Sequence, residues 1–364
     1  MKVVLLAPTP PPIGGIAGWT VRMLNANLKN GWEIILVDEK IVGNRSVFGD
    51  NKNKRNYKDE LIRCLTIWKK LKKTLCDNEV KIVHSCIPSA TLSMMREYIC
   101  ACITKKRKRK FITHFRCTVP NTTRSKIGKF ILNKLCKKSD LIISLNKQTT
   151  EYLRTLTETE IVCVPNFISH EELIFEKEIN DEVKTILYVG GVIKEKGVYE
   201  IIDTAVAFPQ IQFRLVGESQ SDILEYIRYK MVNNVVLVGK LDKKGVRSEM
   251  DNADAFMFLS YFGGEGFSNA LVEAMAAGMP CIVSDWAANS DMIDNGKGGI
   301  VVPIKSAHDV EKAVISILSK EIRQEYSSYN IMKVKSQYLE NIIVDSYVDV
   351  YESCLDGCDR YEIY

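Results

Sequence analysis

The chain has 364 residues, of which 46% are hydrophobic and 26% charged, and its net charge is +5. These values exclude a disordered or low-complexity chain and leave room for about two domains. No apolar run approaches the roughly 20 residues that span a bilayer, and the N-terminal run 3–7 is too short for a secretory signal. The 11 cysteines include no CxxC pair and no histidine at metal-ligand spacing, so we expect reduced thiols, a cytoplasmic protein and no metal site.

Short β-branched runs alternate with longer helical patterns along the first half of the chain. The runs are apolar almost without interruption, which is typical of parallel strands covered on both faces. We expect strands at 3–7, 33–37, 81–85, 111–114, 141–144 and 161–164. We expect helices at 17–29, 57–77, 89–103, 124–138 and 147–156.

A Pro-Asn turn at 165–166, followed by acidic and polar sequence up to residue 181, interrupts this alternation. The pattern then resumes, and its expected strands are 185–189, 213–216, 235–238, 255–259, 281–284 and 300–302. Its expected helices are 197–206, 221–230, 244–251, 267–277, 307–319 and 339–355.

The alternation predicts an α/β fold with two doubly wound domains. We expect the domains to span 1–170 and 171–345, with a C-terminal helix in 346–364 that packs back toward the first domain. Ligands of open α/β sheets bind beyond the carboxyl ends of the strands, so the predicted ligand site is a cleft between the two domains.

Residues 263–280, GGEGFSNALVEAMAAGMP, are the most informative segment of the chain. A strand leads into a glycine loop and then into a helix that we expect to begin near Phe267. Glycine lets the backbone approach a ligand closely, and a helix N-terminus attracts a diphosphate. Glu265 lies at the mouth of the loop, and Glu273 is expected two turns into the helix on roughly the same face, where a carboxylate can accept hydrogen bonds from a ribose. The alternative is an ordinary strand-to-helix turn with two solvated carboxylates, and the surrounding glycines favour the functional interpretation.

This segment resembles the EGF…LEAMAxGxPVI signature of retaining GT-B glycosyltransferases of family 4, with Glu265 and Glu273 as its Glu-x7-Glu pair. The resemblance covers nearly the whole chain and is strongest to bacterial enzymes that build surface polysaccharides. It implies a GT-B fold, in which two Rossmann-like domains face each other across a cleft. Further matches are GGVIKEKG at 190–197 to the GRLxxxKG loop, VPN at 164–166 to the linker turn, PIGG at 12–15 to the N-terminal glycine loop, and LIIS at 141–144 to the strand that closes the first domain.

The resemblance implies that the C-terminal domain binds a nucleotide-sugar donor. Glu273 would hold the ribose, and Glu265, a catalytic residue, would contact hydroxyls of the donor sugar. Lys196 and the helix start near Phe267 would stabilise charge on the leaving diphosphate. The other residues expected to line the donor are Gly14, Gly15, Gly190, Gly191, Gly266, Ser268 and Asn269.

Three further positions bear on this site. His114 ends a strand, where a lone histidine is more often buried and satisfied by the backbone, although in the resembling family a catalytic histidine points from this position into the cleft. Arg116 is expected to meet a phosphate of the donor or of the acceptor. Gly191 stands where the family usually has Arg, which leaves Lys196 and the helix N-terminus as the diphosphate partners.

We therefore expect a retaining glycosyltransferase that moves a sugar from a nucleotide-sugar donor, UDP-linked rather than GDP-linked, to an acceptor hydroxyl. Its expected role is the synthesis of a bacterial surface polysaccharide on a lipid-linked acceptor. No aspartate-rich DxD motif is present, so no metal and no cofactor are expected. Alternatives on the same fold are a nucleotide-sugar epimerase, a phosphorylase and a non-catalytic sugar-nucleotide-binding protein. The first βα turn lacks G-x-G-x-x-G, which argues against a dinucleotide oxidoreductase.

The first half of the chain is strongly basic. Residues 1–175 hold 31 Lys and Arg against 15 Asp and Glu, a net charge of +16, whereas residues 176–364 have a net charge of −11. The basic residues gather in segments 57–77, 105–110 and 124–138. Stacking aromatics are not interleaved with these charges, which argues against nucleic acid. We expect the protein to lie peripherally on the anionic inner face of the cell membrane, where a polyprenyl-diphosphate-linked saccharide is the acceptor.

The alternative for these basic segments is that their apolar stripes face the domain core and their charges are only solvated. The stripes are Leu61, Leu65, Trp68 and Leu75 in the first segment and Ile127, Ile131 and Leu135 in the last.

Overall fold

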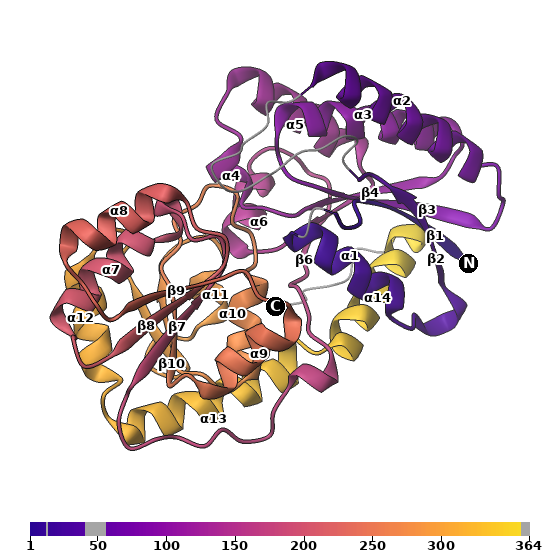
Figure 1. Cartoon of the computed structure of the whole chain (residues 1–364). Helices are drawn as coiled ribbons and strands as arrows, with labels where there is room; N and C mark the ends of the chain where they lie inside the picture. The colour runs from indigo at the N-terminus through magenta and orange to yellow at the C-terminus, as the bar shows by residue number, and fades with distance from the viewer. Residues whose placement is uncertain (12–13, 41–55, 358–364) are drawn as a thin grey trace. The chain divides into compact units, whose positions relative to one another are not determined.

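The computed structural model describes residues 1–11, 14–40 and 56–357 and divides into two compact units (Figure 1). The first unit holds the described residues up to Asn166 together with the C-terminal helix, and the second holds Phe167–Leu339. The boundaries expected from the sequence fall a few residues later, after 170 and 345. Residues 12 and 13 of the predicted glycine loop, and the tail from 358 onward, lie outside the described residues.

The first unit is built on a six-stranded parallel sheet with strand order β2-β1-β3-β4-β5-β6. Each strand lies where an apolar run predicts it. The four central strands are largely buried because helices cover both faces of the sheet, whereas the edge strands β2 and β6 are only partly buried (Figure 1). The strands are β1 (Lys2–Ala7), β2 (Glu33–Asp38), β3 (Val80–Ile87), β4 (Lys110–Phe115), β5 (Leu141–Ser144) and β6 (Ile161–Cys163).

The helices of the first unit form two layers. The layer of α2, α3 and α5 contributes Leu71, Met94 and Leu132 to one buried cluster with the sheet. The other layer contains α1 and the C-terminal helix α14, which lie together on the opposite face (Figure 1). The helices of this unit are α1 (Gly15–Asn25), η1 (Lys29–Gly31), α2 (Tyr57–Thr74), α3 (Thr91–Lys106), α4 (Val119–Thr122), α5 (Lys126–Lys138), α6 (Lys147–Arg154) and α14 (Glu340–Asp356).

Alternate residues of β3 and β4 serve these two layers, because successive side chains of a strand point to opposite faces. Val83 and Phe111 join the cluster under α2, α3 and α5. His84 and His114 lie on the other face, where the Trp19 ring of α1 meets both imidazoles edge-on. Two histidines are thereby placed in the interior beneath α1 and α14.

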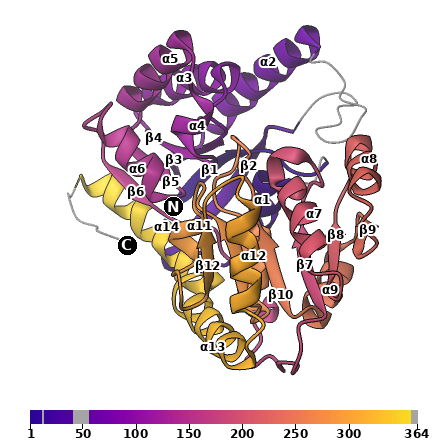
Figure 2. The ribbon, with the colours of Figure 1, turned by 90° about the vertical axis from the view of Figure 1, so that its left-hand side faces the viewer.

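The second unit contains another six-stranded parallel sheet, with strand order β12-β11-β10-β7-β8-β9. Its strands are β7 (Thr185–Val189), β8 (Gln212–Val216), β9 (Val235–Gly239), β10 (Ala255–Phe258), β11 (Cys281–Ser284) and β12 (Gly299–Val302). Its helices are η2 (His170–Glu172), η3 (Lys194–Lys196), α7 (Val198–Ala207), α8 (Ser221–Lys230), α9 (Lys243–Asn252), α10 (Asn269–Ala276), α11 (Asn289–Met292), α12 (Ala307–Ser316) and α13 (Lys320–Gln337). Helices α7 and α12 lie side by side against the sheet (Figure 2). In neither unit does a described helix combine the length and the apolar character that crossing a membrane requires.

Helix α13 is the one long helix that the sequence does not predict among the described residues. Its buried face mixes the polar residues Arg323, Ser327, Asn330 and Lys333 with Tyr326, Ile331 and Val334. The segment therefore lacks an apolar period of 3.6 residues, which is the signal that sequence reasoning uses. Hydrogen bonds satisfy part of this buried polarity: the Asn330 amide nitrogen donates to two backbone carbonyls at 2.8 and 2.7 Å.

Candidate functional site

An ion pair in the second unit joins the two loops that follow β7 and β10. Lys196, the last residue of η3, pairs with Glu265, which lies before α10. Their side chains are 13% and 11% exposed, so the pair is largely shielded but still reachable from solvent. Ser260 Oγ donates to the same carboxylate oxygen at 2.9 Å, and Lys196 Nζ lies 5.0 Å from the centroid of the Phe262 ring. The two charged residues assigned from the sequence to the diphosphate and to the sugar are thus in direct contact.

The approach of these two loops depends on Gly197. Its φ of +77° lies in the left-handed region, and a Cβ at this position would stand 2.2 Å from the Leu259 carbonyl oxygen. Beside it, the Tyr261 N–H donates to the Glu195 carbonyl at 2.9 Å. A side chain at 197 would push the loops apart and move Lys196 away from its partner.

The loop of Gly190 and Gly191 is fixed through its backbone. The Gly190 N–H donates to the Val216 carbonyl at 2.9 Å, and the Tyr188 hydroxyl donates to the Gly191 carbonyl at 2.8 Å. Burial, together with the nearby Glu265 carboxylate, raises the pKa of Tyr188 well above its ordinary value, so the hydroxyl keeps the proton that it donates. The Gly191 backbone is therefore held in place where the resembling family carries an arginine.

Helix α10 begins at Asn269, two residues after the start expected from the sequence. Ser268 is its N-cap, and the Ser268 Oγ accepts a hydrogen bond from the Leu271 N–H at 3.3 Å. Glu265 therefore lies in the loop, and the expectation that it shares a helix face with Glu273 is wrong. Glu273 stands in the second turn of α10 and is half-buried.

The residues between Glu265 and the helix are fixed by contacts within the unit. The Gly266 carbonyl accepts a hydrogen bond from the Ala288 N–H at 3.2 Å. The Phe267 ring is buried and meets the Tyr338 ring edge-on, with 5.4 Å between the centroids. Gly266 thereby shapes the loop, and Phe267 contributes packing rather than a helix start.

In the first unit, Gly14 and Gly15 form the entry to α1. Gly14 is the N-cap and has an extended backbone that any residue can adopt, and Gly15 is the first helical residue. A Cβ at either position would have no described atom within 4 Å. The fold itself therefore does not demand glycine at this loop.

His114 and Arg116, both predicted to reach a substrate, are buried within the first unit. Arg116 donates to His114 Nε2 at 3.1 Å and to Asn166 Oδ1 at 2.6 Å, and its guanidinium carbon lies 4.3 Å from the centroid of the Trp19 ring. His114 Nδ1 lies 3.1 Å from His84 Nε2. Both ring nitrogens of His114 are thus paired inside the unit, so we leave it out of the catalytic groups proposed below.

Donor capacity sets the direction of this hydrogen-bond chain. Arg116 only donates, so His114 accepts at Nε2 and carries its proton on Nδ1, which donates to His84 Nε2. His84 in turn donates from Nδ1 to the Tyr351 hydroxyl of α14 at 2.8 Å. Burial, with a smaller contribution from the Arg116 charge, lowers the pKa of both imidazoles, that of His84 to about 3, and both are neutral near pH 7.

Cys86 stands beside the two imidazoles, and the ligand atoms of His84, Cys86 and His114 lie within 4.8 Å of one another. The grouping was missed because His114 is distant in sequence and is brought opposite Cys86 only by the β3–β4 pairing. The facing imidazole nitrogens are already joined by a hydrogen bond, burial raises the pKa of the Cys86 thiol, and the Arg116 cation is adjacent. These contacts disfavour a further cation, and we assign no metal to the group.

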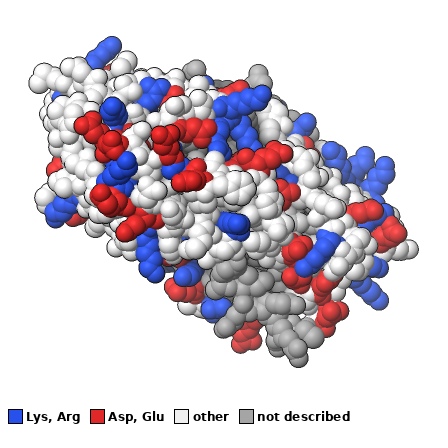
Figure 3. All heavy atoms as spheres, turned by 90° about the horizontal axis from the view of Figure 1, so that it is seen from below, with Lys and Arg blue, Asp and Glu red and all other residues white. Residues whose placement is uncertain are grey.

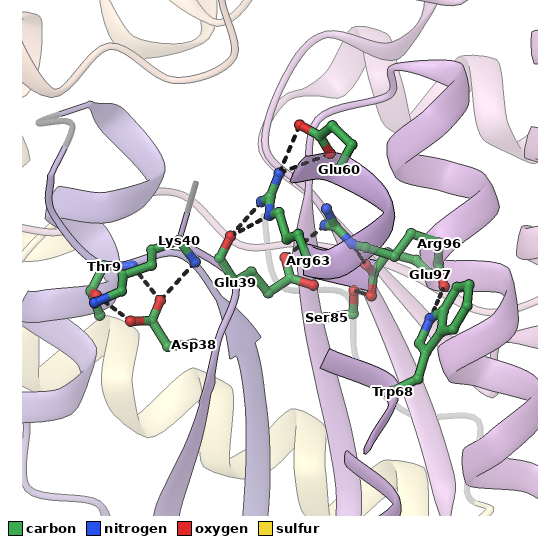
Figure 4. A network of polar contacts seen from close by, with 10 residues as sticks. All are labelled: Thr9, Asp38, Glu39, Lys40, Glu60, Arg63, Trp68, Ser85, Arg96 and Glu97. Atoms are coloured by element: carbon green, nitrogen blue, oxygen red, sulfur yellow. Dashed lines mark hydrogen bonds and ion pairs between the residues drawn. The ribbon is translucent and has the colours of Figure 1, made fainter. Parts of the chain in front are cut away.

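A second polar cluster holds the loop between β1 and α1 (Figure 4). At the end of β2, Asp38 accepts hydrogen bonds from the Thr9 N–H at 3.0 Å and from the Thr9 hydroxyl at 2.6 Å. Asp38 also accepts from the Lys40 N–H at 2.9 Å. One carboxylate thus ties the segment that leads to Gly14 to the neighbouring strand.

Behind this carboxylate lies a buried ionic network (Figure 4). Arg96 of α3 donates to Glu39 at 2.8 Å and to Glu97 at 2.6 Å, and all three side chains are at most 5% exposed. Ser85 Oγ donates to Glu97 at 2.7 Å, and Arg63 of α2 donates from Nε to the Glu39 carbonyl at 2.8 Å. Burial raises the pKa of Glu39, although the Arg96 charge opposes the shift. The network locks α2 and α3 to the sheet, and its charges are partnered, as burial requires.

A family model described as "Glycosyl transferases group 1" matches residues 169–334. The matched part contains Lys196, Glu265 and Glu273, together with the glycine loops around them. It lies entirely within the second unit.

Two curated relatives have names that state their reactions. The chain is 26% identical to the phosphatidyl-myo-inositol mannosyltransferase of Mycobacterium leprae over 186 residues. This matched region is 50% of this chain and 49% of that protein. The chain is also 26% identical over 253 residues, 63% of this chain and 65% of the relative, to the N,N'-diacetylbacillosaminyl-diphospho-undecaprenol alpha-1,3-N-acetylgalactosaminyltransferase of Campylobacter jejuni. The chain thus spans about half of the first relative and just under two thirds of the second.

Among solved structures, the chain is similar to sucrose-phosphate synthase from Thermosynechococcus elongatus. The TM-score is 0.79 at 16% identity, and the match covers 98% of this chain and 100% of that chain. This likeness shows the GT-B fold, that is, two doubly wound α/β units. The family model and the names of the curated relatives support a glycosyltransferase.

Proposed function

We propose that the protein is a retaining, metal-independent glycosyltransferase that moves a hexose-type sugar from a nucleotide-sugar donor to a hydroxyl of a lipid-linked acceptor. The observation that carries the proposal is the Lys196–Glu265 pair, which two glycine-containing loops hold beside the start of α10. This cation and this carboxylate lie at the carboxyl ends of two parallel strands, where α/β sheets bind nucleotides.

Each charged group has one role in the proposed reaction. Lys196 pairs with the donor diphosphate and stabilises the negative charge that grows as the sugar–oxygen bond breaks. Glu265 accepts hydrogen bonds from hydroxyls of the donor sugar, and Glu273 accepts them from the ribose. The leaving phosphate oxygen takes the proton of the acceptor hydroxyl on the face where the new bond forms, as the resemblance to family 4 implies.

The buried residues of the first unit act as positioning groups in this proposal. Arg116 holds Asn166, the last residue of the unit before the second begins, and it also fixes His114. The carboxylate of Asp38 holds the segment that leads to the Gly14–Gly15 loop. The open space at these two glycines leaves their backbone accessible to a ligand.

The acceptor is proposed from the names of the relatives. One name carries phosphatidyl-myo-inositol and the other a diphospho-undecaprenol. Both are lipids with a phosphate or diphosphate next to a carbohydrate-like head. We propose a polyprenyl-diphosphate-linked saccharide for this chain, modified at the cytoplasmic face of a bacterial membrane during synthesis of a surface polysaccharide.

Donor binding and product analysis test the function together. The protein is heated with UDP-, GDP-, ADP- and TDP-sugars, and a true donor at 100 times its dissociation constant adds about 2.7 kcal/mol of stability. UDP-sugars are expected to give the largest shift. NMR of the product then reports whether the anomeric configuration of the donor is kept. Conversion of the donor without acceptor would indicate an epimerase, and binding without any turnover would indicate a non-catalytic protein.

A further inference from the structure

The outward faces of α2, α3 and α5 expose large apolar side chains. Besides Tyr57, eight such residues lie on the three helices: Leu61, Ile62, Leu65, Leu92, Met95, Ile99, Ile127 and Phe130. Their exposed fractions run from 37% at Ile99 to 68% at Ile127. The stripes expected to face the core are therefore split, because Leu61, Leu65 and Ile127 point outward while Leu75 and Leu135 are buried.

These exposed side chains belong to three helices that are neighbours in the fold. Apart from the adjacent Leu61 and Ile62, they are three or four residues apart on each helix, which places them on one side of that helix. Helices α2, α3 and α5 lie side by side on the same face of the sheet (Figures 1 and 2). We call the outward side of these three helices the outer face. Single exposed apolar residues need no explanation, but an apolar surface shared by three helices marks an interaction site.

The same three helices also carry exposed basic residues. They are Lys58, Lys69, Lys70, Lys72, Lys73, Lys106, Lys126, Lys129, Lys134 and Lys137. Acidic residues are few: α5 has none, Glu97 of α3 is buried, and α2 has Asp59 and Glu60, of which Glu60 pairs with Arg63. Lys134 Nζ lies 5.6 Å from the centroid of the Phe130 ring, so a basic and an apolar side chain are in contact on this face. The outer face therefore offers apolar side chains and uncompensated positive charge together.

This composition differs from the face seen in Figure 3, where basic and acidic side chains are interspersed. Two copies of the chain meeting through their outer faces would bring lysines against lysines, which opposes association. A nucleic acid would pair with the lysines but would leave the aliphatic side chains without a partner. An anionic bilayer satisfies both, because phosphate head groups receive the lysines and the acyl boundary receives the apolar side chains.

We propose that the outer face docks on an anionic lipid bilayer. Leu65, Ile127 and Phe130 enter the boundary between head groups and acyl chains, and the lysines around them pair with lipid phosphates. The choice of a bilayer rests on the proposed function, since a lipid-linked acceptor is presented at such a surface. The composition of the outer face identifies the part of the chain that would contact the bilayer.

The full chain is sedimented with vesicles of phosphatidylcholine alone and of phosphatidylcholine mixed with phosphatidylglycerol. We expect at least tenfold tighter binding to the anionic vesicles at 50 mM salt and a marked loss at 500 mM, because exposed charges are screened over a few ångströms at high salt. Equal binding to both vesicles, or binding to neither, would overturn the proposal without any variant being made.

Two sets of variants separate the apolar and the basic parts. L65S/I127S/F130S is expected to weaken binding to anionic vesicles at least tenfold, and K69A/K134A/K137A about a hundredfold. Matched controls in the second unit are F175S/M231S, whose native side chains are 88% and 84% exposed, and K240A/K244A/K335A, whose lysines are also exposed. The controls are expected to bind like the unaltered chain. Equal losses in the controls would contradict the assignment to the outer face.

Two further readouts keep this inference distinct from the proposed function. L65S/I127S/F130S is expected to retain nucleotide binding, whereas E265Q is expected to retain vesicle binding. Analytical ultracentrifugation checks for self-association: a dimer that the same triple substitution dissolves would mean that a second copy covers the outer face, and the membrane proposal would be wrong. If the unaltered chain binds nucleotide but not vesicles, the docking surface is rejected and the proposed function is not.

Discussion

At the residue scale, Lys196 has two anionic partners in the proposed mechanism, the Glu265 carboxylate and the donor diphosphate. The structure shows the first contact directly. Ser260 also hydrogen-bonds Glu265, so the carboxylate keeps a partner when Lys196 turns to a phosphate. When Lys196 moves from Glu265 to the diphosphate, the Glu265 carboxylate therefore keeps its hydrogen bond from Ser260. An unpartnered buried charge would be costly.

The two members of this pair are predicted to have separable effects. Lys196→Ala removes the cation that meets the diphosphate, so affinity for a nucleoside diphosphate and for the intact donor should fall about tenfold to a hundredfold, as expected for a charge-assisted hydrogen bond. Glu265→Gln keeps the shape and removes the charge, so affinity for the nucleoside diphosphate should stay or rise while turnover falls. Calorimetry with both ligands measures the split.

Lys194→Ala is the matched control, since this lysine lies on the same short turn and stacks on the Tyr199 ring at 5.1 Å. It should bind both ligands like the unaltered chain. If Lys194→Ala and Lys196→Ala lose equal affinity, the Lys196 effect is one of general electrostatics. If Glu265→Gln loses equal affinity for the nucleoside diphosphate and for the intact donor, its role at the sugar is rejected.

The two buried histidines give a prediction about protonation. The pKa of His84 is lowered to about 3 and that of His114 is also strongly lowered, chiefly by burial, so both imidazoles should remain neutral from pH 7.5 to 5.5. Their NMR resonances, identified with H84Q and H114Q variants, should not move over this range. A titration of either resonance with a midpoint near 6.5 would contradict the hydrogen-bond chain.

The lowered pKa of His84 and His114 also determines how the free energy of unfolding depends on pH. Below about pH 6.5 the unfolded chain binds protons on these two imidazoles and the folded chain does not. The stability of the folded chain therefore begins to fall as the pH drops below about 6.5, and for His84 the loss continues until the pH reaches its folded pKa of about 3. Acid should destabilise the first unit partly through this pair.

At the element scale, the position of Gly197 between η3 and α7 determines how closely the two donor loops approach. Gly197→Ala should cost more than 2 kcal/mol of unfolding free energy, from left-handed strain of about 1–2 kcal/mol together with the overlap with the Leu259 carbonyl. Gly239→Ala is the control: its φ of +82° imposes the same strain, but a Cβ there meets nothing within 4 Å. Urea unfolding measures both, and equal losses would refute the close-approach argument.

Helix α13 gives a second prediction at this scale. Arg323 is fully buried and donates to the Asn180 and Asp181 carbonyls at 2.9 and 3.0 Å, which ties the helix to the segment before β7. Arg323→Met should lower the unfolding free energy by about 2 kcal/mol, because two charge-assisted hydrogen bonds are lost. Lys320→Met removes only an exposed ion pair to Asp181 and should change little. Equal melting temperatures of the two variants would contradict the structural role of Arg323.

The sequence predicts the helices and strands that bury apolar side chains, but it does not predict those whose buried faces carry polar side chains. Within the described part of the chain, all twelve strands lie where the apolar runs predict them, with ends that agree within a residue or two. The mixed polar and apolar buried face of α13 and the short α4 and α11 gave no periodic signal. The apolar stripe of α2 was recognised, but the sequence did not reveal which of its residues face water, because the tilt of a helix on a sheet is set by its neighbours.

The candidate site was predicted in part for a similar reason. Lys196 and Glu265 were identified because each stands in a glycine loop after a strand, and parallel strands bring such loops together. The exact start of α10 depends on the Ser268 cap, which shifted it by two residues. The pairing of His84 with His114 depends on strand order, which a single sequence does not state.

At the scale of the whole molecule, the two halves of the chain differ in charge as they differ in proposed task. The half with net charge −11 contains the Lys196 and Glu265 loops, where a few placed cations select a nucleotide. The half with net charge +16 carries the outer face of α2, α3 and α5, where many exposed lysines favour an extended anionic surface. The prediction is that high salt weakens vesicle binding far more than nucleotide binding, since the Lys196–Glu265 loops are shielded and the outer face is not.

The most direct test of the central claim is sugar transfer itself. The chain is incubated with the nucleotide sugar that stabilises it most and with a polyprenyl-diphosphate-linked saccharide, and mass spectrometry follows the lipid. We predict the addition of one sugar residue, with a rate about 10²–10³-fold lower for Glu265→Gln and unchanged for Lys194→Ala. A bound donor with no change in acceptor mass, or a Glu265→Gln variant that transfers at the rate of the unaltered chain, would contradict the account.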